Sequence, residues 1–265
     1  MPLPSTPEPR QRRRWPWILL ALFLAFAGTV GWQVFTERRA IRQLEEAGFT
    51  IKKQKSMWVL ARSDWHFLFK PKAWKASLER RVVARENAPF AAQPAQLRNF
   101  DALAPALRRL NPDYIAIGYP SCPALENVDG LQGLNALQVV VILNCPSLLN
   151  LEGLKGIPHL RSLHQYDCRA LQNFDHLKGL ADLEELHLSG CTNLRNTDAL
   201  QGLTKLQVIT FRDCPALENV DALKGLAKLS RITIFRSPKL SKEAIAALKS
   251  ALPNTKVQID YWVVP

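Results

Sequence analysis

Apolar positions along the C-terminal two thirds of this chain recur with a fixed period of 23 residues. Each copy has the form L-x-x-L-x-L-x-x-C, and the cysteines are Cys122, Cys145, Cys168, Cys191 and Cys214. Alternate residues of a strand point to opposite faces, so the paired apolar positions predict a strand with one buried face. After each cysteine, leucines recur every three residues, which favours a short 3₁₀-like return. A period of this length predicts one structural unit copied in tandem.

Polar residues repeat in phase with the cysteines. Asparagine stands five positions after each cysteine, an acidic residue seven after and glycine eleven after, as in Asn196, Asp198 and Gly202. We expect the asparagines to be buried and to satisfy turn backbone, the acidic residues to cap the short helices, and the glycines to ease a left-handed turn. Gln165 and Thr197 replace expected apolar core residues, and we expect both to make local hydrogen bonds.

Residues from about 97 to 260 resemble the leucine-rich-repeat family, in the form found in bacterial internalin-like proteins. One copy that carries the signature is Leu183, Leu186, Leu188 and Cys191, with cysteine in the position often held by asparagine. The resemblance implies an α/β solenoid, a right-handed coil with a parallel sheet on its concave face. Stacking of neighbouring coils would bury the apolar faces. The signature identifies a fold and a style of binding, and no particular ligand.

The cysteine column allows three interpretations, which are disulfides, zinc ligands or buried thiols. Neighbouring coils would bring cysteines within bridging distance. However, five is an odd number, all would point into the core, and the chain has no C-x-x-C motif. We therefore expect free, buried thiols, and no metal or cofactor.

The N-terminal region has a different pattern. Residues Trp15–Phe35 form a stretch of 21 residues without a charge, with arginines on both sides and tryptophans near its ends. This length and composition predict a transmembrane helix or signal-anchor, and the whole chain would be a single-pass membrane protein. A signal peptide cleaved near Ala27 is an alternative. We expect the repeats to be extracytoplasmic, in the periplasm; secretion after cleavage or a cytoplasm-facing domain are the alternatives.

Five regions follow from these patterns: a basic tail at 1–14, the membrane segment at 15–35, a basic juxtamembrane connector and N-terminal cap at 36–95, the repeats at 96–236 and a C-terminal cap at 237–265. In the connector we predict a helix at Thr36–Ala47, paired strands at Phe49–Lys53 and Met57–Ala61, and an earlier cap strand around Val82 and Val83. Its aromatic residues cover the first coil or, alternatively, lie on lipid headgroups. The C-terminal cap should contain a serine-capped helix, Ser241–Leu252, and a strand, Lys256–Tyr261.

The net charge of +12 is concentrated near the predicted membrane segment. Residues 1–95 contain 17 basic and 7 acidic residues, whereas residues 96–265 contain 18 and 16. A basic stripe on the folded domain would indicate nucleic-acid binding. The nearly equal numbers of basic and acidic residues in the repeats argue against such a stripe. The surplus instead favours contact with anionic lipid.

Function is expected on the outward strand positions. This surface begins apolar, becomes polar and ends with arginine and phenylalanine, which suggests a protein or peptide partner. Tyr166, Arg212, Arg231 and Phe235 are the residue types most common in binding hot spots. The candidate binding residues are Val139, Val141, Leu143, His164, Tyr166, Glu185, His187, Arg212, Arg231, Thr233 and Phe235.

Two further features of the sequence concern chemistry. His164 and His187 should lie about 5 Å apart on adjacent coils, beside Glu185; a weak metal site is conceivable, and we prefer an incidental pair. The chain has no catalytic motif, so we expect no enzyme activity and no small-molecule substrate. The preferred hypothesis is a membrane-anchored protein-interaction module. The alternatives are a structural cell-envelope protein, or a regulatory subunit of a membrane complex, without a specific solenoid ligand.

Overall fold

The computed structural model describes residues 15–47, 49–53, 80–84, 97–118, 121–172 and 174–260. The chain divides into two units between Arg39 and Ala40, and helix α1 (Trp15–Glu46) crosses this boundary. In the part of the chain that the structure describes, no helix has the length and apolarity needed to cross a bilayer. The structure therefore gives no support to the membrane segment predicted at Trp15–Phe35.

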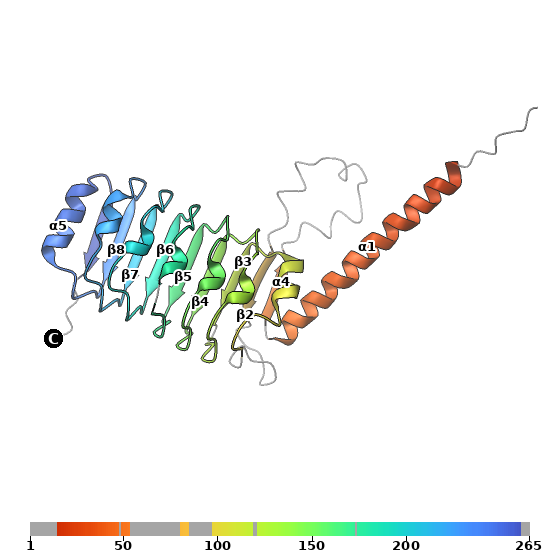
Figure 1. The fold of residues 1–265 in the computed structure, drawn as a ribbon, viewed down its shortest axis with the longest axis horizontal. Helices are drawn as coiled ribbons and strands as arrows, with labels where there is room; N and C mark the ends of the chain where they lie inside the picture. The colour runs from red at the N-terminus through yellow and green to blue at the C-terminus, as the bar shows by residue number, and fades with distance from the viewer. Residues whose placement is uncertain are drawn as a thin grey trace, which may run out of the picture. The chain divides into compact units, whose positions relative to one another are not determined.

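Within the described residues of the second unit, nine strands form one sheet in chain order (Figure 1). The first two strands pair antiparallel and every later pair is parallel. The strands are β1 (Phe49–Lys53), β2 (Arg80–Ala84), β3 (Tyr114–Ile117), β4 (Val139–Leu143), β5 (Ser162–Tyr166), β6 (Glu185–Ser189), β7 (Val208–Arg212), β8 (Arg231–Phe235) and β9 (Lys256–Asp260).

Short 3₁₀ helices return the chain from one strand to the next, as the three-residue leucine spacing predicts. They are η3 (Asp129–Leu131), η4 (Glu152–Leu154), η5 (Asp175–Leu177), η6 (Asp198–Leu200) and η7 (Asp221–Gly225). Each contacts the next, so the returns stack as the strands do. Longer helices stand near the two ends of the stack, α4 (Ala104–Leu110) and α5 (Lys242–Ala251).

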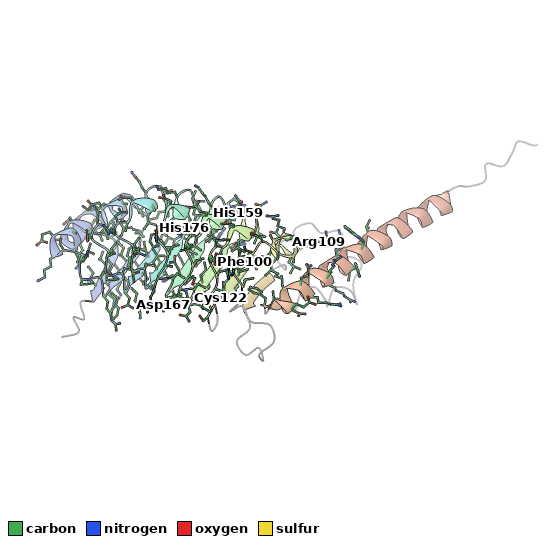
Figure 2. All side chains as sticks on the ribbon, turned by 60° about the horizontal axis from the view of Figure 1, so that its bottom comes forward. Phe100, Arg109, Cys122, His159, Asp167 and His176 are labelled. Atoms are coloured by element: carbon green, nitrogen blue, oxygen red, sulfur yellow. The ribbon has the colours of Figure 1, made fainter. Side chains whose placement is uncertain are left out.

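The register of the sheet repeats every 23 residues, so equivalent residues of successive coils face each other. Val140 pairs with Leu163, Leu163 with Leu186, and Leu186 with Ile209. These side chains are fully buried, and a buried side chain of this size contributes about 1.5–3 kcal/mol. Side chains such as those of Phe100 and Cys122 fill the interior of the coils (Figure 2). The repeat, the parallel sheet and the continuous core together define a leucine-rich-repeat solenoid.

The N-terminal end of the core is covered by residues from α1 and β1. Ala40, Leu44 and Phe49 are buried, and the Phe49 ring lies 5.8 Å from that of Phe100. Strand β1 forms as predicted, but it pairs with β2. The predicted partner, Met57–Ala61, lies outside the described residues. The earlier cap strand predicted around Val82 and Val83 is confirmed as β2.

The C-terminal end closes with the predicted helix and strand. Helix α5 begins after Ser241, whose Oγ accepts a hydrogen bond of 3.1 Å from the backbone N–H of Ala244. Strand β9 ends at Asp260, and Tyr261, the last residue of the predicted strand, lies outside the described residues.

The asparagine column satisfies turn backbone as predicted, whereas the acidic column does not have its predicted role. The asparagine oxygens accept hydrogen bonds from the backbone N–H two residues later, for example Asn219 Oδ1 from Asp221 at 2.7 Å. The same bond forms at Asn127, Asn150 and Asn196. These asparagines are half-buried or exposed, so the prediction that they are buried is wrong, while the predicted hydrogen bonds to turn backbone are confirmed. The acidic residues are the first residues of the helices and cap none of them by a side-chain hydrogen bond.

The predictions for the glycines and cysteines are largely confirmed. Gly133, Gly156, Gly179 and Gly202 have φ between 76° and 88°, and only Gly225, inside the longer η7, does not. All five cysteines are free and buried. The neighbouring thiols of Cys122 and Cys168 raise the pKa of Cys145 and burial adds to this effect, which makes the thiol a poor nucleophile.

The two polar core residues are buried, with fewer hydrogen bonds than predicted. Gln165 Nε2 lies 3.6 Å from the sulfur of Cys191. Gln165 Oε1 and Thr197 Oγ1 have no hydrogen-bond partner among the described residues. The predicted local hydrogen bonds are therefore absent at Thr197 and incomplete at Gln165.

Candidate functional site: the outer face of the sheet

Alternate side chains of β4–β8 point away from the core, and we call this surface the outer face. In β4, β7 and β8 burial alternates along the strand, so the outward residues are half-buried or exposed while their neighbours are buried. On β5 and β6 the small outward residues Ser162 and Ser189 are buried as well. The structure places all the predicted binding residues on this face. They are Val139, Val141 and Leu143 on β4, His164 and Tyr166 on β5, Glu185 and His187 on β6, Arg212 on β7, and Arg231, Thr233 and Phe235 on β8.

The parallel register arranges these side chains in three columns that run across the strands. The first column contains Val139, Ser162, Glu185, Val208 and Arg231; the second contains Val141, His164, His187, Thr210 and Thr233; the third contains Leu143, Tyr166, Ser189, Arg212 and Phe235. Equivalent residues on adjacent strands are about 4.8 Å apart in such a sheet, so each column forms a continuous contact surface.

The chemical character of the outer face changes from one end to the other. On β4 the three outward residues are Val139, Val141 and Leu143, all half-buried and apolar. On β7 and β8 the exposed residues are Arg212 and Arg231. An apolar end and a cationic end therefore lie on one rigid sheet.

A network of polar side chains occupies the middle of the outer face. Ser162 Oγ lies 2.7 Å from His164 Nε2 and donates a hydrogen bond of 3.4 Å to Glu185 Oε2. His164 Nδ1 lies 3.3 Å from the Tyr166 hydroxyl. The rings of His164 and His187 stack, with centroids 4.4 Å apart and an angle of 14° between planes. The sequence predicted this pair at about 5 Å.

Partial burial changes the ionisation of this network. Desolvation lowers the pKa of both His164 and His187 below the usual histidine value, and the neighbouring His187 lowers that of His164 further. The carboxylate of Glu185 opposes both shifts. Desolvation also raises the pKa of Tyr166, against the positive charge of Arg212. The two imidazoles are therefore neutral near pH 7.

The hydrogen bonds of Ser162 are not those of a catalytic relay. In a serine–histidine–acid triad the acid accepts a hydrogen bond from the histidine and orients it. Here Glu185 accepts a hydrogen bond from the Ser162 hydroxyl and not from a histidine. The nitrogen of His164 that faces away from Ser162, Nδ1, contacts the Tyr166 hydroxyl. The arrangement orients a histidine ring and does not activate the serine.

Two arginines flank the aromatic residue at the C-terminal end of the outer face. The guanidinium carbons of Arg212 and Arg236 lie 5.1 and 4.9 Å from the centre of the Phe235 ring. Arg236 also pairs with Asp213 at 3.2 Å. These contacts hold Phe235 in one orientation while its side chain stays partly exposed.

The sequence pattern did not single out Arg236, Asp213 or Ser162. Asp213 and Arg236 occupy the same turn position of successive coils, directly before Cys214 and before Ser237, which stands in the place of the cysteine. Both have positive φ, 52° and 50°. In the three coils before these two, this position holds asparagine, aspartate or glycine, the residue types that tolerate positive φ. This recurrence is a signal in the sequence from which the turn position could have been recognised. Ser162 is recognisable as an outward residue, but its hydrogen bonds depend on rotamers that the pattern does not show.

The comparisons with known proteins concern the fold alone. No family model and no curated protein matches the chain. Among solved structures, the chain is similar to an internalin from Listeria monocytogenes, at 14% identity and a TM-score of 0.42 over 68% of this chain and 46% of that one. It is also similar to a leucine-rich-repeat protein from Leptospira interrogans, at 14% identity and a TM-score of 0.42 over 58% and 44%.

A third similar structure is the leucine-rich-repeat domain of a type III effector, at 18% identity and a TM-score of 0.41 over 69% of this chain and 76% of that one. The chain spans less than half the length of the first two structures. At these TM-scores we draw nothing from the likeness. The leucine-rich-repeat class rests on the repeat of this chain and the register of its own sheet.

Proposed function

We propose that this chain is a protein-interaction module that binds a protein or peptide partner through the outer face. The observation that carries the proposal is the column of Leu143, Tyr166, Arg212 and Phe235, in which large side chains remain accessible on a rigid sheet. Tyrosine and arginine are enriched in binding hot spots, and aromatic residues in interfaces generally.

The rigidity of this surface supports the proposal. Phe235 is flanked by two guanidinium groups, and Tyr166 meets His164 through its hydroxyl. Side chains that are already ordered lose less conformational entropy when a partner binds. A surface of ordered side chains therefore binds a partner more tightly than a surface of mobile side chains would.

The gradient along the outer face defines the chemistry of the partner. The apolar side chains of Val139, Val141 and Leu143 suit an apolar segment, whereas Arg212 and Arg231 suit an acidic one. Charge complementarity would set the orientation of the partner and accelerate its association. We therefore propose a partner that carries an apolar patch beside acidic residues.

The experiment that tests this function is site-specific cross-linking. A photo-cross-linking amino acid replaces Thr233 on the outer face or, as the control, the exposed Gln201 on a return segment. We expect one protein to cross-link from position 233 and none from position 201. The same adduct from both positions, or none from position 233, would contradict the proposal.

The purified partner then allows a quantitative comparison. The combined variant Tyr166→Ala, Arg212→Ala and Phe235→Ala should weaken binding at least about 30-fold, the effect of one 2 kcal/mol hot spot. The matched control changes three exposed residues of the returns, Lys155→Ala, Arg195→Ala and Gln201→Ala. If binding survives in the first variant, the contacts lie outside the outer face, as in a regulatory subunit. If the chain has no partner at all, a structural role becomes the better hypothesis.

The proposal includes membrane attachment through residues 15–35, with the repeats outside the cytoplasm. Its support is the uncharged sequence of 21 residues between arginine clusters. A topology reporter fused after Pro265 should be active only outside the cytoplasm, and the chain should remain in the membrane fraction after alkaline extraction. Release into the soluble fraction would contradict attachment and leave the interaction proposal intact.

A further inference from the structure

Three side chains that can bind a metal ion meet in the middle of the outer face. His164 and His187 are paired residues of adjacent strands, and Glu185 stands two positions before His187 on the same strand. One ligand atom from each of the three lies within 4.8 Å of the others. From the sequence we preferred an incidental histidine pair; the structure shows the two rings stacked and one ligand atom of Glu185 close to both.

We propose that His164, Glu185 and His187 form a surface site for a divalent transition-metal ion, with Zn²⁺ as the fitting ion. Two imidazole nitrogens and one carboxylate oxygen are the protein ligands of one type of open zinc site, in which the fourth position is left to water or substrate. Mg²⁺ and Ca²⁺ prefer oxygen ligands throughout, so the two histidines disfavour them.

The hydrogen bonds of Ser162 show where the ion would lie. Its hydroxyl contacts His164 Nε2 at 2.7 Å and Glu185 Oε2 at 3.4 Å, so the nitrogen and the carboxylate already approach a common point. An ion bound there would replace the hydroxyl as the group that joins them. The Ser162 side chain is thus a neighbour of the site and not one of its three ligands.

The opposite nitrogen of His164 has the outer contact that metal-binding histidines usually make. When Nε2 binds an ion, Nδ1 carries the proton and can donate it to the Tyr166 hydroxyl, which lies 3.3 Å away. Such contacts fix the tautomer and the orientation of the ring, and their loss typically costs about 10- to 100-fold in metal affinity. Tyr166 is therefore a positioning residue for the site.

Closing the site requires the ligand atoms to move closer and the two stacked rings to tilt so that a nitrogen of each points at one ion. Bonds of about 2.0–2.2 Å in a tetrahedral zinc site place ligand atoms roughly 3.4 Å apart, which is less than the 4.8 Å spread. Glu185 is exposed, and no lysine or arginine lies within ion-pair distance of it among the described residues. The contact that the carboxylate would exchange for the ion is the 3.4 Å hydrogen bond from Ser162.

The test is a titration of the full-length, chelator-treated chain with Zn²⁺ alone, followed by calorimetry under reducing conditions at about pH 7.5. We expect saturation at one ion per chain. His187→Ala and Glu185→Gln should each weaken binding by more than the roughly 10- to 100-fold that loss of an outer contact costs. Both positions are accessible on the outer face, and circular dichroism checks that the variants fold.

The matched control is His159→Ala, which removes an exposed histidine outside the site that also faces a carboxylate, that of Asp182, at 3.3 Å. It should leave the affinity unchanged. Co²⁺ provides a second readout, because its visible absorption bands should appear with the wild-type chain and vanish with His164→Ala. An absence of saturable binding, or equal binding by wild type, His187→Ala and Glu185→Gln, would overturn the proposal. Equal binding would place the ion elsewhere, for instance on the cysteines.

Discussion

The guanidinium carbon of Arg212 lies 5.1 Å from the centre of the Phe235 ring, across two paired strands of the outer face. The contact joins an exposed cation to a partly exposed ring, and cation–π pairs at exposed sites contribute about 0.5–1 kcal/mol. It therefore orders two of the proposed contact residues without being a major source of stability.

A double-mutant cycle of Arg212→Ala and Phe235→Ala should reveal this contact as a coupling energy of about 0.5–1 kcal/mol in the free energy of unfolding. Urea denaturation of the four proteins provides the measurement. The control cycle combines Phe235→Ala with Arg231→Ala, which removes the exposed arginine at the start of β8. The control should show a coupling energy near zero. Equal coupling energies in both cycles would mean that Phe235 responds to the overall positive charge of the surface and not to a specific contact with Arg212.

A second prediction concerns Gln165 in the core. Its Oε1 has no hydrogen-bond partner among the described residues, while the paired positions on the adjacent strands are Ile142 and Leu188. Leaving a buried polar group unsatisfied costs about 1–3 kcal/mol. Gln165→Met, which keeps the unbranched shape, should therefore stabilise the domain by roughly that amount and raise its Tm in calorimetry.

The reverse change provides the control for this prediction. Leu188→Gln introduces an amide at the equivalent buried position of the next coil, and it should destabilise the domain. If Gln165→Met lowers the Tm instead, the amide of Gln165 makes a favourable interaction that the hydrogen-bond geometry does not show.

The solenoid could be predicted from the sequence because its coils are nearly identical. A 23-residue period that repeats both apolar and polar positions determines strand direction, strand order and register together, since equivalent residues must stack. Val140, Leu163 and Leu186 face each other for this reason. The same argument predicts that His164 lies beside His187, because the two histidines are one period apart on outward positions.

Other features were not predictable, for identifiable physical reasons. Asparagine and aspartate side chains can both accept a backbone hydrogen bond at a turn, so composition alone assigns this role to both columns, whereas in the structure Asn219 accepts the bond and the backbone N–H of Asp221 donates it. Strand β1 pairs with β2 across an intervening segment, and a local pattern has no signal for such a distant antiparallel partner. At the candidate site, the network around Ser162 depends on rotamers, which residue spacing does not specify.

A third prediction tests the asparagine column. Asn219→Ala removes the acceptor for the backbone N–H of Asp221, a bond of 2.7 Å at the start of η7. Loss of a capping side chain costs about 0.5–2 kcal/mol. We expect the free energy of unfolding to fall by about 1 kcal/mol in urea denaturation. Gln201→Ala, at an exposed position of another return, should change it by less than about 0.5 kcal/mol. Equal effects of the two substitutions would remove the structural role that we assign to the column.

The last prediction concerns pH and a carboxylate shared by three coils. Asp182 accepts a hydrogen bond of 2.6 Å from Lys205 Nζ and contacts His159 Nδ1 at 3.3 Å, and these residues stand one repeat after and one repeat before it. The hydrogen bond from Lys205, followed by that from His159, holds the pKa of Asp182 below the usual aspartate value. The charged form is therefore favoured in the folded chain.

A lowered pKa in the folded state stabilises the protein above the unfolded value of about 3.9, and this contribution disappears as the pH falls through the folded pKa. Asp182→Asn should thus lower the Tm at pH 7, and the difference from wild type should shrink as the pH falls below about 3.9 and then through the folded pKa. High salt should shrink the difference at pH 7 because the pair is exposed. Lys205→Met should show the same pH dependence. If the Tm difference between wild type and Asp182→Asn stays constant from pH 7 to pH 2, the substitution acts through packing and the charge of the Asp182 carboxylate contributes nothing.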